Sequence, residues 1–136
     1  MTVNPYLSFD GNCREAFEFY KELLGGELFL MTYGDSPMAS ELPAEHHDRV
    51  VHAYLGAGDI VLMGGESPSG EYQEPQGITI NIQTDSVGEG SRIFEALARD
   101  GKVMMPFEET FWVERFGMVR DRFGTPWMVN AGKADG

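Results

Sequence analysis

Apolar and polar residues alternate along this chain with two different periods, and the order of those periods recurs. Residues 3–9 alternate with a period of two and put Leu7 and Phe9 on one face, which predicts a strand. Helical spacing follows, and Gly25-Gly26 is expected to end the helix. The apolar stripe of this predicted helix consists of Cys13, Ala16, Phe17, Tyr20, Leu23 and Leu24.

Three more strands are predicted in the first half of the chain. They cover about 27–33, 49–56 and 59–64, and the last two are joined by a tight turn at Gly56-Ala57-Gly58-Asp59. The intervening residues 34–48 are rich in glycine, proline, serine and acids, so we expect a loop.

The second half repeats this order at a spacing of about 75 residues, with Leu7 aligned to Ile82 and Gly26 to Gly101. Its apolar helical stripe is Val87, Gly90, Ser91, Phe94, Leu97 and Ala98. Its strands are predicted at about 78–84, 102–105, 115–121 and 126–131. We therefore predict an α+β fold of two βαβββ modules that form paired, curved, mixed sheets around a central cavity.

The two modules are expected over 1–66 and 78–136, with 67–77 as the linker, in one compact domain overall. Each predicted helix begins with capping-box spacing. Asn12 is followed by Glu15, and Ser86 is followed by Glu89.

Composition removes several classes of partner. The formal net charge of -12 repels phosphate backbones and anionic lipid, so we expect neither nucleic-acid nor membrane binding. No apolar run approaches the ~20 residues of a spanning helix, and the N-terminal residues lack the pattern of a secretory signal. Cys13 is the single cysteine, which excludes an internal disulfide and favours a cytoplasmic location. Its place in the apolar stripe favours core packing over a reactive thiolate.

Two groups of residues could carry chemistry. His52 and Tyr54 share one face of a predicted strand, where His52 is either a general base or a histidine hydrogen-bonded within the wall. Residues 108–115 are predicted as a loop between strands that is dense in charge and aromatic surface. Within it, Trp112 either stacks on a planar ligand or seals the core, and Arg115 either clamps an anion or pairs with a glutamate. Trp127 is expected in the core.

Three runs carry a likeness to a known family. They are Tyr6-Leu7-x-Phe9-x-Gly11-Asn12-x-x-Glu15-Ala16-Phe17-x-Phe19-Tyr20, His52-Ala53-x-Leu55, and Glu109-Thr110-Phe111-Trp112-x-x-Arg115-Phe116-Gly117-Met118-Val119-x-Asp121-x-Phe123-Gly124-x-x-Trp127-Met128-Val129-Asn130. In these runs the chain resembles the vicinal oxygen chelate superfamily of glyoxalases, bleomycin-resistance proteins and extradiol dioxygenases, and in particular its PhnB-like branch. That branch sometimes carries a methyltransferase label, which the absence of a glycine-rich nucleotide loop does not support.

The resemblance implies four metal-ligand positions, which fall at Asn4, Leu62, Thr79 and Met128. None of these is a histidine or an acid, so we expect no metal and no other cofactor. A separate site at His46-His47-Asp48 is not expected, because adjacent residues rarely aim at one ion. The resemblance also implies a homodimer.

The function expected from these observations is binding of a small molecule in a metal-free cavity, in a resistance or metabolite-sequestering role. The alternative is a small-metabolite lyase or isomerase with His52 as general base and Arg115 as electrostatic clamp. A third possibility is a scaffold whose cavity is filled by side chains. The predicted ligand-binding residues are Asn4, Tyr6, Ser8, Tyr54, Asn81, Gln83, Trp112 and Arg115, with His52 as the catalytic candidate.

Overall fold

A computed structural model describes residues 1–134 of the chain and divides it into two compact units, residues 1–74 and 75–136. Each unit contains one four-stranded mixed sheet and one long helix, in the order strand, helix, three strands. The predicted α+β architecture of two βαβββ modules is confirmed. Among the described residues, no helix is long and apolar enough to cross a membrane.

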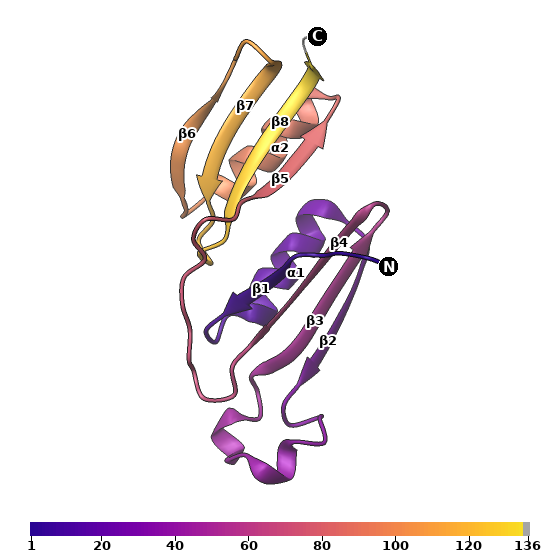
Figure 1. The fold of residues 1–136 in the computed structure, drawn as a ribbon, viewed down its shortest axis with the longest axis vertical. Helices are drawn as coiled ribbons and strands as arrows, with labels where there is room; N and C mark the ends of the chain where they lie inside the picture. Colours follow the sequence, from indigo (N-terminus) through magenta and orange to yellow (C-terminus); the bar gives the residue numbers. More distant parts are fainter. Residues whose placement is uncertain (135–136) are drawn as a thin grey trace. The chain divides into compact units, whose positions relative to one another are not determined.

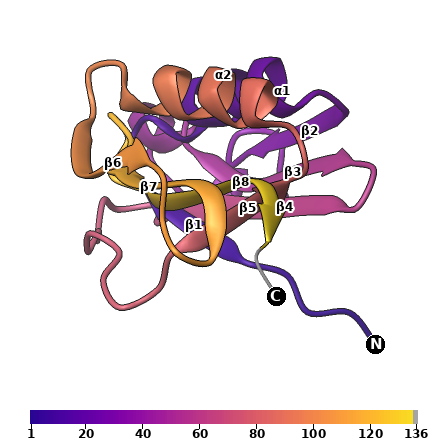
Figure 2. The same cartoon turned by 90° about the horizontal axis from the view of Figure 1, so that it is seen from above.

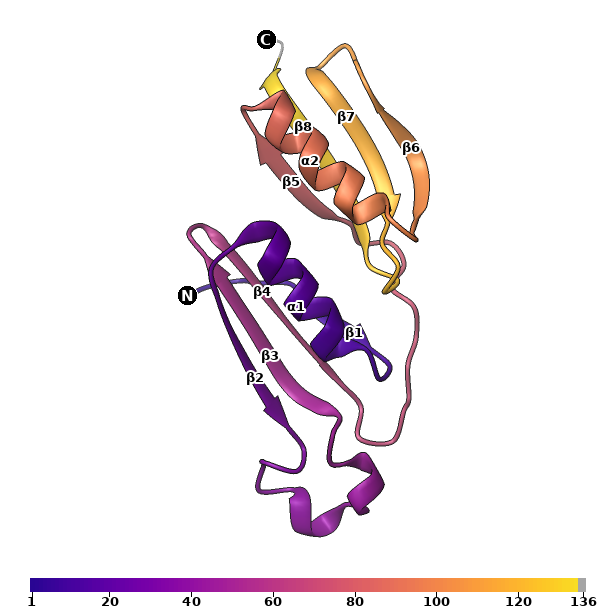
Figure 3. The same ribbon diagram turned by 180° about the vertical axis from the view of Figure 1, so that it is seen from behind.

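In the first unit the sheet order is β1-β4-β3-β2, with β1 parallel to β4 and the other neighbours antiparallel. The helix lies along one face of this sheet (Figures 1 and 3). The elements are β1 (Tyr6–Phe9), α1 (Cys13–Leu24), β2 (Glu27–Thr32), β3 (Val50–Ala57) and β4 (Ile60–Glu66), with short 3-10 turns η1 (Ala39–Glu41) and η2 (Ala44–His46) between β2 and β3.

The second unit repeats this plan with the sheet order β5-β8-β7-β6, in which β5 runs parallel to β8. Its helix covers one face of its sheet, as Figure 2 shows from above. The elements are β5 (Ile80–Thr84), α2 (Val87–Ala98), β6 (Lys102–Glu108), β7 (Val113–Arg120) and β8 (Pro126–Ala134).

The core of each unit lies between its helix and its sheet. The first helix buries all but one of the residues predicted as its apolar stripe, the exception being the half-buried Leu24. The contact is close enough to require a glycine, because a Cβ on Gly64 of β4 would lie 2.7 Å from Phe17 of α1. The opposite face of each sheet carries no helix, so alternate strand residues point away from the core.

A buried aspartate organises the turn between β7 and β8. One carboxyl oxygen of Asp121 accepts the backbone N–H groups of Phe123 (2.9 Å) and Thr125 (3.0 Å). The other accepts the indole N–H of Trp127 at 2.8 Å. Trp127 is 1% exposed, which confirms its predicted place in the core. The run from Asp121 to Trp127 therefore holds the turn together.

Several predicted element boundaries are wrong. The first strands of the two units begin at Tyr6 and Ile80, later than predicted, while β6 and β8 extend further than predicted. β7 begins at Val113, so Glu114 and Arg115 lie in a strand, and Glu108 ends β6. The predicted loop over 108–115 is therefore only the short connection 109–112.

The predicted caps have different outcomes. Ser86 accepts the backbone N–H of Glu89 at 3.0 Å, which confirms a side-chain cap on α2. Asn12 makes no side-chain cap bond, so that prediction is wrong for α1. The side chain of Glu66, at the end of β4, instead accepts the N–H of Cys13 at 3.3 Å. Glu66 is remote in sequence, so local spacing could not reveal this cap.

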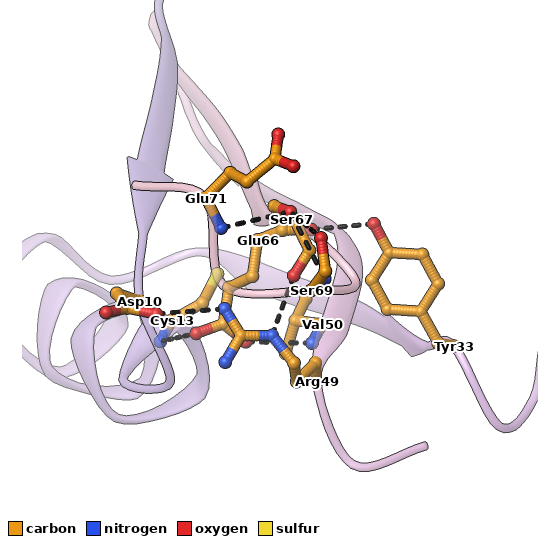
Figure 4. Close-up of polar contacts among 9 residues, drawn as sticks. All are labelled: Asp10, Cys13, Tyr33, Arg49, Val50, Glu66, Ser67, Ser69 and Glu71. Carbon is orange, nitrogen blue, oxygen red and sulfur yellow. Dashed lines mark hydrogen bonds and ion pairs between the residues drawn. The ribbon is translucent and has the colours of Figure 1, made fainter. Parts of the chain in front are cut away.

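Glu66 is the centre of a buried polar cluster in the first unit (Figure 4). Its second carboxyl oxygen accepts the N–H of Val50 at 2.9 Å, and its backbone carbonyl accepts the hydroxyl of Tyr33 at 2.7 Å. Arg49 donates to the carbonyl of Ser67 at 2.7 Å and to Asp10 at 3.1 Å. The cluster joins α1, the start of β3 and the end of β4, so its role is structural.

Burial in the first place and the nearby Glu66 carboxyl in the second raise the pKa of the Cys13 thiol to about 12. The thiol is fully buried in the helical stripe. The predicted role of Cys13 as a core residue is confirmed, and it cannot serve as a nucleophile near neutral pH.

Replacement of Asp121 with alanine is expected to lower the free energy of unfolding by about 3 kcal/mol or more, because three buried N–H donors lose their acceptor. Urea unfolding monitored by circular dichroism measures this change. Asp59→Ala, on the exposed turn before β4, is the matched control and should change stability by less than about 0.5 kcal/mol. Equal stability of the two variants would contradict the assigned role of Asp121.

Cys13 should react with iodoacetamide at pH 8 at least roughly a hundredfold more slowly in the native protein than in denaturing guanidinium, because its raised pKa leaves little thiolate. Mass spectrometry of the alkylated protein measures both rates. Because the unfolded thiol ionises near its ordinary value of 9.0, the stability that this group contributes should fall as pH rises from 9.0 toward about 12. Equal alkylation rates would contradict the burial of the thiol.

Candidate functional site

The open face of the second sheet, opposite α2, carries a row of amide side chains. Asn81 and Gln83 alternate along β5 with Ile80 and Ile82, which are less exposed. In the neighbouring strand, Asn130 is the register partner of Gln83. Three amides from two parallel strands therefore lie together on one face.

A hollow of about 250 Å³ opens at one end of this face. The ends of β5 and β8 form part of its lining, and the segment just before β7 supplies Trp112, which is 37% exposed. The lining residues are Gln83, Thr84, Asp85, Trp112, Val113, Asn130 and Gly132. The hollow is large enough for a small organic molecule or a fragment of one.

A chain of hydrogen bonds runs from Trp112 through Asn130, which both line the hollow, to Asn81. The indole N–H of Trp112 donates to Oδ1 of Asn130 at 3.2 Å, and Nδ2 of Asn130 donates to Oδ1 of Asn81 at 2.7 Å. The Trp112 ring also packs edge-on against Phe116, with ring centroids 5.2 Å apart. These contacts hold Trp112 at the edge of the hollow with its polar atom already paired.

A β-bulge shapes the rim. Val113 pairs with Ala134 and Arg115 with Ala131, so β8 has one more residue than β7 between these pairs. Gly132 lies in the bulge with a φ of 90°, and a Cβ there would lie 2.6 Å from the side chain of Glu114. Glu114 crosses the bulge and accepts the N–H of Lys133 at 3.0 Å.

Arg115 follows the bulge and lies in the regular part of β7. This residue is paired with Ala131, which is buried against α2 near Gly90. Arg115 therefore belongs to the helix-covered side of the sheet, and its guanidinium donates to the carbonyl of Glu114 at 2.7 Å. The structure does not bring Arg115 together with the amides of the open face, where it was expected.

The first sheet also has an open face, and this one is aromatic. Tyr6 of β1 and His52 of β3 lie side by side, with ring centroids 6.0 Å apart and planes 26° apart. The Tyr6 hydroxyl donates to the carbonyl of Val51 at 3.3 Å, and burial raises its pKa. His52 is half-buried, and Tyr54 follows two residues later on the same face. Ser8 lies beyond Tyr6 on this face, while Asn4 precedes the strand.

The resemblance implies four metal-ligand positions, and the strand register shows where they lie. Tyr6 pairs with Met63, whereas Leu62 is buried on the helix side, so the equivalent of Met128 is Met63 and the alignment with Leu62 is wrong by one residue. Methionine stands at both last-strand positions, and a thioether is a poor ligand for zinc, iron or manganese. Within residues 1–134, no three histidine, cysteine or acidic side chains are grouped to hold a metal. The residues at these positions therefore do not fit a zinc, iron or manganese site.

Five lining residues escaped the sequence-based prediction, namely Thr84, Asp85, Val113, Asn130 and Gly132. Asp85 follows β5 and continues the alternate positions of Asn81 and Gln83. Asn130 had been quoted only as the end of a motif. The amides at 81, 83 and 130 on outward strand positions were the available signal for this site.

Comparison with known proteins places this architecture in a family. Residues 2–129 match the model of the Glyoxalase/Bleomycin resistance protein/Dioxygenase superfamily. The chain is 38% identical to Protein YjdN of Escherichia coli (strain K12) over 98% of this chain and 97% of that protein.

Solved structures give the same result. Protein PA1353 from Pseudomonas aeruginosa has a TM-score of 0.88 and 45% identity, covering 97% of this chain and 98% of that one. A PhnB protein from Bacillus cereus, a candidate 3-demethylubiquinone-9 3-methyltransferase, has a TM-score of 0.79 over 97% of this chain and 100% of that one. Its 20% identity shows a shared fold alone. The resemblance predicted from the sequence is confirmed, and the chain belongs to the Glyoxalase/Bleomycin resistance protein/Dioxygenase superfamily.

Proposed function

We propose that this protein binds a small molecule without a metal ion, in a resistance or metabolite-sequestering role, and that the hollow of the second unit is its binding site. The observation that carries the proposal is the position of Trp112. A half-exposed indole whose N–H is already paired offers a ring face for stacking at the edge of a hollow of about 250 Å³.

The composition of the lining supports binding of a polar, planar compound. Gln83 can donate and accept hydrogen bonds, Asn130 offers its oxygen, and Thr84 adds a hydroxyl that also accepts the N–H of Ser86. The backbone around them belongs to paired strands, so these groups are held in place before a ligand arrives. Such a site can bind and orient a compound, and the lining contains no histidine or cysteine to serve as a base or nucleophile.

A second candidate function, a lyase or isomerase with His52 as general base, is favoured by one observation. His52 is half-buried on the open face of the first sheet, where its ring stacks on Tyr6. A fully buried histidine bonded to the backbone would have ended this candidate. This candidate does not include Arg115 as its clamp, because the register of β7 puts that residue on the helix-covered side of its own sheet.

A homodimer remains part of the proposal. One support is family membership. The other is that each unit presents edge strands and a sheet face without a helix, which are surfaces for packing of a second copy.

Native mass spectrometry of the protein incubated with a small-molecule extract of its own host should show one retained compound per chain, no stoichiometric zinc, iron or manganese, and the mass of a dimer. Trp112→Ala should weaken retention at least about tenfold because the stacking surface is lost. The control is Phe111→Ala, an 87% exposed neighbour that contacts the Trp112 ring but does not line the hollow. Equal retention by both variants, or a bound metal, would contradict the proposal.

The enzymatic candidate predicts that compounds in the same extract are consumed over time. If His52 is the general base, His52→Ala should slow consumption by about a hundredfold or more. His46→Ala, on the loop between β2 and β3, is the matched control and should leave the rate unchanged. Chromatography with mass detection measures the time course. Unchanged consumption by the His52 variant would exclude His52 as the base.

A further inference from the structure

The hydrogen-bond chain in the second unit has a fixed direction. An indole N–H can only donate, so the atom of Asn130 that faces Trp112 must be its oxygen. Turning the Asn130 amide over would set its NH2 group against the indole N–H, with two donors facing each other. The nitrogen of Asn130 therefore faces Asn81, as the 2.7 Å contact requires.

This direction decides what Asn130 presents to the hollow. Its oxygen lies toward Trp112, which lines the hollow, and its nitrogen lies toward Asn81, which does not. A carbonyl oxygen has two lone pairs, and Trp112 uses one of them. Asn130 is thereby held as a hydrogen-bond acceptor on the hollow side.

The charge of the lining also favours a ligand that donates hydrogen bonds. Asp85 is the only charged residue among those that line the hollow, and within residues 1–134 its carboxyl makes no hydrogen bond or ion pair. Glu114 adds a second carboxyl behind Gly132. Both favour a positive or N–H-bearing group in the hollow.

An anionic ligand has one argument in its favour, since α2 begins at Val87, just after Asp85, and helix N-termini attract anions. The N–H of Glu89, however, is already taken by the Ser86 side chain. Asp85 also lies at this helix end, whereas the charge of Glu89 is paired with Arg92 at 2.6 Å. The Asn130 oxygen and the Asp85 carboxyl therefore decide the expected ligand charge more than the helix N-terminus does. Binding of an anion is one of the outcomes that the test distinguishes.

We infer that the hollow selects a planar ligand with a cationic N–H donor group, such as an amidinium, a guanidinium or a protonated aromatic amine, and that Trp112 is a positioning residue that sets this preference through Asn130. The ring of such a ligand stacks on Trp112, while its N–H groups donate to Asn130 and Asp85. This inference rests on the proposed function of the hollow as a binding site.

Three probes of nearly equal shape test the inference, namely benzamidine as its cation, neutral benzamide and anionic benzoate. Each is titrated to about 10 mM, and the indole N–H signal of Trp112 is followed by NMR. That signal reports the hollow directly, because Trp127 is buried and bonded to Asp121. We expect benzamidine to bind about tenfold more tightly than benzamide, and benzoate more weakly still.

Two variants locate the charge preference. Asp85→Asn should reduce the preference for benzamidine over benzamide from about tenfold to about twofold. Asp59→Asn makes the same change in net charge on an exposed turn of the first unit and should leave the preference intact. An equal loss in both variants would overturn the assignment to Asp85.

The positioning role of Trp112 is tested by a rescue, followed through the Gln83 side-chain amide signals. Trp112→Phe keeps a ring but removes the N–H, so the Asn130 amide can turn over and the preference should fall about threefold. Adding Asn130→Asp should restore it to the level of the Asn130→Asp single variant, which accounts for the added charge, because a carboxylate presents oxygen in either orientation. A preference that stays low in the double variant would show that Trp112 acts only through its bulk and would overturn this role.

The outcomes separate the two proposals. If benzamide or benzoate shifts the Trp112 signal at lower concentration than benzamidine, the inferred ligand class is wrong while the hollow remains a binding site. If no probe shifts the signal at about 10 mM, the inference fails, and retention of a host compound decides the proposed function separately.

Discussion

Each four-stranded sheet in this protein has one helix, and one helix can cover only one of its two faces. As a result, alternate residues of every strand point either toward the helix or away from it. Residues such as Ala53 and Val129 fill the core beneath a helix, whereas His52 and Asn130, next to them in sequence, face the other way. The candidate sites consist of residues on the sheet faces that are not needed for the core.

The two open faces nevertheless differ in character. That of the first sheet is built from aromatic rings and methionines around Tyr6 and His52, and that of the second from amides around Asn130. A duplicated architecture therefore presents two distinct chemical surfaces. The difference arises at outward positions, where packing against a helix does not restrict the side chain.

Buried carboxyl groups secure each unit at a strand end. Glu66 ties the start of α1 to the start of β3, and Asp121 ties the turn after β7 to Trp127. In both cases a side chain collects N–H groups that would otherwise be buried without an acceptor. The run Asp121 to Trp127, which belongs to the C-terminal run of the family resemblance, is explained by this turn and describes the fold more than a reaction.

Much of the fold could be predicted because its signals are local. The helical stripe of α1 and the cap at Ser86 depend on residues a few positions apart. The cap on α1 could not be predicted, because Glu66 comes from a strand more than fifty residues away. Arg115 was misplaced because residues 108–115 were predicted as a loop, whereas β7 begins at Val113 and its alternation puts Arg115 on the same buried side as Gly117 and Val119.

The candidate site shows the same division between local and distant information. Asn81, Gln83 and Trp112 were predicted from outward alternation and exposed aromatic character, whereas Asp85 entered only when the hollow was located. The motif that identifies the family includes both Trp112 and Asn130, and the structure joins them by a hydrogen bond. A sequence pattern can therefore record a bonded pair that prepares a site. The charged residue that distinguishes one ligand from another, Asp85, lies outside that pattern, so family membership and ligand choice are carried by different residues.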